Sequence, residues 1–131
     1  MDFDEIRKRY REFLDWDKDT LDDRVTRMAG EYAYYQNFYI QATEEKNKVE
    51  TELKEMWQGK WKYYKYEFEV SLDKSEIKGF IEKDLDIIKL QGRLTNYETY
   101  RDFFKECMKN IDQMRWDIKT YLDYKKFMAG M

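Results

Sequence analysis

The segment Lys60-Trp61-Lys62-Tyr63-Tyr64-Lys65-Tyr66 contains the residue types in this chain most suited to binding chemistry. Lysine side chains neutralise phosphate groups, and aromatic rings stack on unpaired bases without reading their sequence. The surrounding residues 54–66 carry four Lys and one Glu, although the whole chain has a net charge of −3. The pattern predicts a site for single-stranded nucleic acid formed by Lys54, Lys60, Trp61, Lys62, Tyr63, Tyr64 and Lys65.

The same segment has a purely structural interpretation. Its aromatic rings could fill a hydrophobic core while the aliphatic stems of the lysines lie over them and keep their charges in water. The residue pattern alone leaves both interpretations open.

Catalytic residue types are scarce. The chain has no His and one Cys, Cys107, which excludes an imidazole base, a Cys-His pair and a zinc site built from several thiolates. Cys107 lies beside an apolar stripe, so we expect a structural thiol. Asp84 and Asp86 could hold a divalent metal, but acidic residues are also favoured at a helix start. We therefore predict a protein that is not an enzyme and has no metal site and no cofactor.

Composition limits the class of protein. Of 131 residues, 40% are charged and 18% are aromatic, and a disordered chain would share the charge but not the aromatic content. No apolar run approaches the ~20 residues of a membrane span, and residues 1–5 lack the features of a signal peptide. A single cysteine fits a reducing compartment. We expect one domain over residues 1–131, located in the cytoplasm and not in a membrane.

Hydrophobic periodicity predicts an all-α fold with two long, coiled-coil-like helices. Apolar residues, with one polar exception at Lys46, recur at steps of four and three from Leu21 to Met56, which is a heptad pattern sustained over five repeats. Asp73 or Ser75 is expected to cap a short helix. The expected elements are a short N-terminal helix at about 3–15, long helices at about 20–63 and 84–127, and a short helix at about 75–83.

Residues 64–73 alternate between apolar and polar side chains, and this alternation predicts an extended strand. Such a strand needs a partner, either in a local hairpin or in another subunit. For the basic segment itself we favour a helix that continues to about Tyr63. A helix puts Lys60 on the same face as Tyr64 and Lys62 elsewhere, which favours Lys60 as the DNA contact.

The last long helix has more apolar surface than one intrachain partner covers. We expect a subunit interface there, or else additional side chains of the protomer's own core. The residues concerned are Trp116, Ile118, Tyr121, Leu122, Tyr124 and Phe127.

Three segments resemble the UvsY-type recombination mediators of T4-like bacteriophages. Lys60-Trp61-Lys62-Tyr63-Tyr64 resembles that family's basic box with its Tyr-Tyr pair. Residues 75–86 (SEIKGFIEKDLD) resemble its capped helix and the acidic start of its last helix, and RWDIK with KFMAG in residues 115–130 resembles its closing signature. The resemblance covers about residues 13–131, but the Ser-Gly turn that usually follows the tyrosines is absent.

The resemblance implies a helical protein that binds single-stranded DNA as a homo-oligomeric ring, a hexamer or heptamer. It also implies two partners in the infected host cytoplasm, a RecA-like phage recombinase and the phage single-stranded-DNA-binding protein. The family's two basic DNA contacts fall on Lys60 and Lys62 if their spacing is kept, or on Gln58 and Lys60 if the tyrosines are aligned. The rival interpretation is a helical oligomeric scaffold that does not contact nucleic acid.

Overall fold

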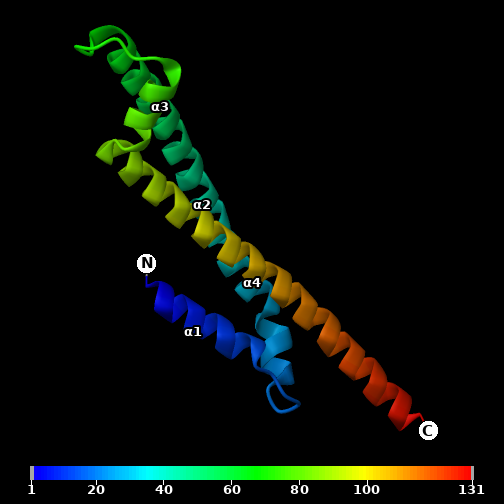
Figure 1. Ribbon diagram of the computed structural model, residues 1–131. Coiled ribbons are helices and arrows are strands. Elements are labelled where there is room, and N and C mark those ends of the chain that lie inside the picture. The colour runs from blue at the N-terminus through cyan, green and yellow to red at the C-terminus, as the bar shows by residue number, and fades with distance from the viewer. Residues whose placement is uncertain (1, 131) are drawn as a thin grey trace. The chain divides into compact units, whose positions relative to one another are not determined.

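The computed structural model describes residues 2–130 and shows a chain of helices joined by short connections (Figure 1). The elements are α1 (Phe3–Leu14), α2 (Leu21–Lys62), the π-helical turn η1 (Tyr63–Glu67), α3 (Lys74–Glu82) and α4 (Leu85–Ala129). The all-α prediction is confirmed, and the two ends of each expected helix lie within about two residues of the observed ends. Residues 2–39 and 102–130 form one compact unit, here the first unit, and residues 40–101 form the second unit.

Local side-chain hydrogen bonds explain where α3 and α4 begin. Asp73, rather than the alternative Ser75, caps α3: its carboxylate accepts the Glu76 N–H at 2.8 Å while the Glu76 side chain accepts the Asp73 N–H at 3.2 Å. Asp84 caps α4 in a similar way. Its Oδ1 accepts the backbone N–H of Asp86 at 2.9 Å and that of Ile87 at 3.3 Å.

The first unit is held together largely by aromatic contacts between α1 and the two long helices. The ring of Phe3 meets that of Phe103 edge to face, and the ring of Phe38 stacks on that of Phe104. Such pairs stabilise a core beyond the area that they bury. The buried side chains of this unit include Ile6, Phe13, Tyr35, Phe104, Cys107, Ile111, Met114 and Ile118.

A buried carboxylate joins α1 to α2 in the first unit. Glu31 is 3% exposed, and its Oε1 lies 2.8 Å from Arg9 Nη2 and 3.1 Å from Arg27 Nη2. The guanidinium carbon of Arg9 also lies 3.7 Å from the centre of the Tyr34 ring. Two cations therefore offset the cost of burying one negative charge.

The second unit has its own small core. Ile77, Ile81 and Ile87 are buried together, and partly buried side chains pack around them from α2, η1 and the segment before α3. Ala42 and Val49 of α2 are also buried in this unit. The surrounding residues are Leu53, Met56, Trp57, Trp61, Tyr64 and Leu72.

The predicted strand at residues 64–73 is wrong, since residues 2–130 contain no strand. α2 instead widens into η1, in which the Phe68 N–H donates to the Tyr63 carbonyl at 3.0 Å, and an irregular segment leads to Asp73. Two residues of the alternating set, Tyr64 and Phe68, pack on α3, whereas Tyr66 and Val70 are exposed to solvent. The rings of Tyr64 and Phe68 lie 5.4 and 5.6 Å from that of Phe80.

Candidate nucleic-acid interface

The basic segment lies at the end of α2 and in the turn that follows it. α2 ends at Lys62, so the expectation of a helix continuing to about Tyr63 is confirmed. Lys60, Trp61 and Lys62 therefore occupy three different directions around the helix axis, and Tyr63 and Tyr64 belong to η1. The structure brings the predicted residues into one region of the second unit but not onto one face.

Lys60 is engaged within the second unit. Its Nζ lies 3.1 Å from Asp84 Oδ2 and 3.6 Å from Asp86 Oδ2, at the start of α4. The hydrogen bond to Asp84 raises the pKa of Lys60, so the ammonium stays charged. A DNA phosphate would have to compete with two carboxylates for this cation.

Asp84 is the less exposed member of the pair, at 14% for its side chain. Burial alone would raise the pKa of Asp84, but hydrogen bonds from Lys60 and from the Ile87 and Asp86 N–H groups outweigh it. The net effect is a pKa below the ordinary value of 3.8. Asp84 is therefore ionised at neutral pH, both as a helix cap and as a partner of Lys60.

The other lysines of the predicted site are unpaired within the described chain. Lys54, Lys62 and Lys65 are exposed and form no ion pair with any residue from 2 to 130. Lys65 Nζ lies over the ring of Tyr66, 5.4 Å from its centre. Because none of these three ammonium groups is paired with a carboxylate of residues 2–130, they are available to phosphate groups.

The two tyrosines of the box differ in their surroundings. Tyr64 is half-buried, and its ring stacks on that of Phe80 with an interplanar angle of 21°. Tyr63 is 45% exposed and meets the rings of Tyr64 and Phe68 at steep angles. Tyr63 therefore presents more free ring surface than Tyr64.

Two shallow hollows lie along α2 in the same unit. One, of about 350 Å³, is lined by Glu50, Leu53, Lys54, Trp57 and Gln58. The other, of about 360 Å³, is lined by Trp57, Gln58, Trp61 and Lys62. Trp57 was not among the predicted site residues, although its four-residue spacing to Trp61 places the two indoles on neighbouring turns.

The first unit carries the side chains predicted for oligomerisation. Trp116, Leu122, Tyr124 and Phe127 are 55%, 39%, 56% and 67% exposed. Ile118 is buried in the protomer, and the half-buried ring of Tyr121 meets that of Trp16 edge to face. Four of the six predicted residues therefore remain open to a partner.

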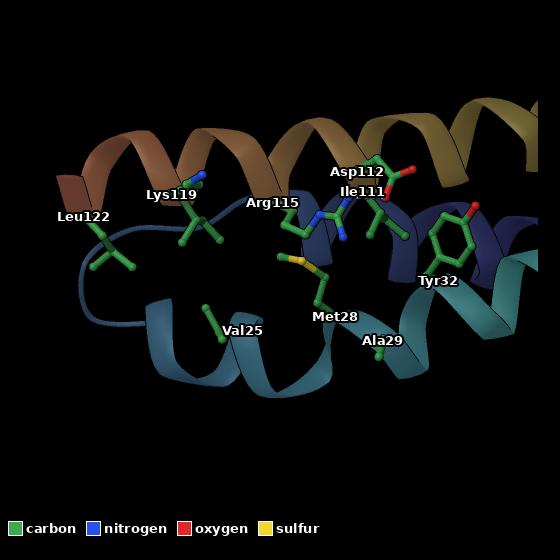
Figure 2. A pocket seen from close by; sticks show the side chains of 10 residues that line it. Val25, Met28, Ala29, Tyr32, Ile111, Asp112, Arg115, Lys119 and Leu122 are labelled. Atoms are coloured by element: carbon green, nitrogen blue, oxygen red, sulfur yellow. Dashed lines mark ion pairs between the residues drawn. The ribbon is translucent and has the colours of Figure 1, made fainter. Parts of the chain in front are cut away.

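A groove of about 710 Å³ lies between α2 and α4 in the first unit (Figure 2). Val25, Met28 and Tyr32 line it from α2, and Ile111, Arg115 and Leu122 line it from α4. Figure 2 shows the side chains of Met28 and Arg115 extending toward each other across it. Its lining is mainly apolar, which suits the side chains of a protein more than a nucleic acid.

Other kinds of site find no support among the described residues. No group of three or more His, Cys, Asp or Glu in residues 2–130 is arranged to hold a metal ion. Within the same residues, no helix combines the length and apolar character needed to cross a membrane. Cys107 is fully buried, and burial raises the pKa of its thiol to about 12, as expected for a structural cysteine.

Comparisons with known proteins identify one matching family. The family model for "Recombination, repair and ssDNA binding protein UvsY" matches residues 9–131. No curated protein sequence matches the chain.

Crystal structures of the bacteriophage T4 recombination mediator protein UvsY have the same fold. The lattice type II structure aligns with a TM-score of 0.86 at 19% identity, covering 98% of each chain. Lattice types IV and I both align with a TM-score of 0.83, at 18% and 20% identity. The type IV match covers 98% of this chain and 99% of the other, and the type I match covers 95% and 98%.

Proposed function

Because the chain belongs to the UvsY family of recombination, repair and single-stranded-DNA-binding proteins, we propose that it is a mediator that binds single-stranded DNA and helps load a RecA-like phage recombinase. The DNA in question is covered by the phage single-stranded-DNA-binding protein, which the mediator must help displace. The family match over residues 9–131 is the observation that carries the proposal. The family consists of non-enzymatic recombination proteins, which confirms the prediction of a protein that is not an enzyme.

The end of α2 is the proposed DNA site. Its supporting features are the unpaired charges of Lys54, Lys62 and Lys65 and the partly exposed rings of Trp61 and Tyr63. Lys60 and Tyr64 belong to the same segment, but each already contacts a residue of the second unit. Single-stranded DNA requires this combination of phosphate neutralisation and stacking.

A homo-oligomer, a hexamer or heptamer as the family resemblance implies, completes the proposal. One protomer offers only a few unpaired lysines, so its own contribution to DNA affinity is small. Repetition of the segment around a ring adds these contributions along one strand. The exposed apolar side chains of α4 and the groove of the first unit are surfaces through which copies could associate. The proposed location is the cytoplasm of the infected host cell.

Fluorescence anisotropy with a labelled, unstructured oligonucleotide tests DNA binding. We expect affinity that falls steeply with salt, because bound lysines release counterions from phosphates. A variant with Lys54, Lys60, Lys62 and Lys65 all changed to Ala should lose most of this affinity. Lys89→Ala, an exposed lysine of the second unit outside the segment, is the matched control.

Recombinase loading is tested separately. A RecA-like phage recombinase is mixed with oligonucleotide already covered by the phage single-stranded-DNA-binding protein, and its DNA-dependent ATP hydrolysis is followed. Addition of this protein should shorten the lag before hydrolysis.

In the anisotropy assay, no binding of the parent protein to the oligonucleotide at ~50 mM salt would instead support the scaffold interpretation and overturn the proposal.

A further inference from the structure

We propose that the face of α2 bearing Trp57 and Trp61 is a base-stacking surface, flanked by Lys54 and Lys62 as phosphate contacts. Trp57 thereby gains a binding role, and Lys62 becomes a stronger phosphate contact than Lys60. The inference rests on the proposed function, because it specifies where on the second unit single-stranded DNA lies.

The spacing along α2 places these residues on one surface. Lys54, Gln58 and Trp61 follow at steps of four and three residues, and Trp57 lies one turn before Trp61. The two hollows confirm that their side chains adjoin, because both are lined by Trp57 and Gln58. Lys54 borders one hollow and Lys62 borders the other, so cations stand at both ends of the indole pair.

Both indoles are held in place by the core. Trp57 and Trp61 are partly buried and pack around Ile77, Ile81 and Ile87, yet each also lines a hollow that opens to solvent. A ring fixed on one side and open on the other loses little conformational freedom when a base stacks on it. Tyr64 is less suitable, since its ring already stacks on Phe80.

Charge on this face favours a polyanion. Lys54 and Lys62 form no ion pair within residues 2–130, in contrast to Lys60, which faces Asp84 and Asp86. The carboxylate that lines this surface, Glu50, is paired with Lys46 at 3.2 Å. Unneutralised lysines on either side of aromatic rings fit the alternating phosphates and bases of a single strand.

The test compares full-length variants in anisotropy titrations with a short oligothymidine at several salt concentrations. Trp57→Leu should weaken binding by about 5- to 150-fold per stacked base, with an unchanged salt slope. Trp57→Phe keeps an aromatic face and should retain most of the affinity. Lys62→Ala should lower both the affinity and the salt slope, and Lys60→Ala should lower the slope less.

Circular dichroism and thermal melting of each variant separate lost stacking from lost folding, and Lys89→Ala is the control for a changed surface charge.

If Trp57→Leu and Lys62→Ala bind DNA like the parent, the proposed stacking surface is wrong although the proposed function stands. Parental DNA binding combined with lost recombinase stimulation would instead assign this face to a protein partner, which also overturns the inference. If the parent protein binds no DNA, the proposed function fails as well.

Discussion

The ammonium group of Lys60 lies 3.1 Å from Asp84, whose other carboxylate oxygen caps α4. The pair joins the end of α2 to the start of α4 inside the second unit, close to the core formed around Ile87. One residue of the basic segment therefore has a structural role that is independent of DNA. Because Lys60 pairs with Asp84, substitutions at Asp84 test the stability of the protein, and substitutions at the unpaired lysines test its DNA affinity.

We expect Asp84→Ala to lower the free energy of unfolding by about 1–2 kcal/mol, through the lost cap and the lost ion pair. Urea denaturation at neutral pH measures the loss. Asp86→Ala is the matched control, because Asp86 is 68% exposed and lies farther from Lys60, at 3.6 Å. Equal losses for the two variants would contradict a special role for Asp84.

The contribution of Asp84 should depend on pH. Its pKa in the folded protein lies below the ordinary value of 3.8, so its ionised form stabilises the fold above that value. This stabilisation is lost as the pH falls through the depressed pKa. The difference in unfolding free energy between the parent and Asp84→Asn should thus be constant near neutrality and shrink below about pH 4. A difference that grows on acidification would refute this assignment.

Removal of the buried carboxylate of Glu31 should loosen α1. Glu31→Ala leaves Arg9 and Arg27 without their shared partner, but both guanidinium groups reach solvent, which limits the loss to about 3 kcal/mol or less. Urea denaturation gives the free energy, and faster tryptic cleavage within α1 reports the local change. Glu45→Ala breaks an exposed pair with Lys48 and should cost less than about 1 kcal/mol.

Tyr35→Phe should stabilise the protein. Tyr35 is fully buried, and its hydroxyl has no hydrogen-bond partner among the described residues. Burial is also the main reason why the pKa of this hydroxyl is raised. Removal of the unpaired group should increase the free energy of unfolding by about 1 kcal/mol. A loss of stability in thermal melts would show that the hydroxyl has a partner, such as a bound water.

Substitution of exposed apolar residues on α4 should dissociate the proposed homo-oligomer without unfolding the protomer. Trp116→Ala combined with Phe127→Ala removes two rings that are 55% and 67% exposed. We expect a smaller native mass by light scattering and unchanged helical content by circular dichroism. Removal of the chain from Tyr121 onward is a less specific test, because Tyr121 contacts Trp16. An unchanged native mass would exclude these side chains from the interface.

The helices were predictable because local signals specify them. The heptad pattern predicted α2, and the choice of Asp73 or Ser75 as the cap predicted the start of α3, where Asp73 is the residue that caps. The alternation after Tyr64 was misleading, since a π-helical turn and an irregular segment place Tyr64 and Phe68 on α3 but leave Tyr66, the ring between them in the alternating pattern, 73% exposed. In such a case periodicity does not distinguish a strand from a turn that packs on α3.

The features of the candidate site that could not be predicted from the sequence depend on contacts between residues that are distant in the chain. The spacing of lysines gave no indication that Lys60 faces Asp84, because this pairing depends on how α2 and α4 meet. The position of Trp57 was likewise hidden, since the sequence did not show which face of α2 lies against the isoleucine core. In contrast, the exposure of Phe127 followed from the excess of apolar residues on α4.

The burial of Cys107 has a practical consequence for spectroscopy. It is the single cysteine of the chain, and a thiol with a pKa of about 12 is almost entirely protonated and unreactive near pH 7. A cysteine introduced at an exposed position, such as Lys89, would therefore react selectively with a maleimide dye. The parent sequence thus provides a background for attaching a single fluorophore or spin label per protomer, without first replacing the native cysteine.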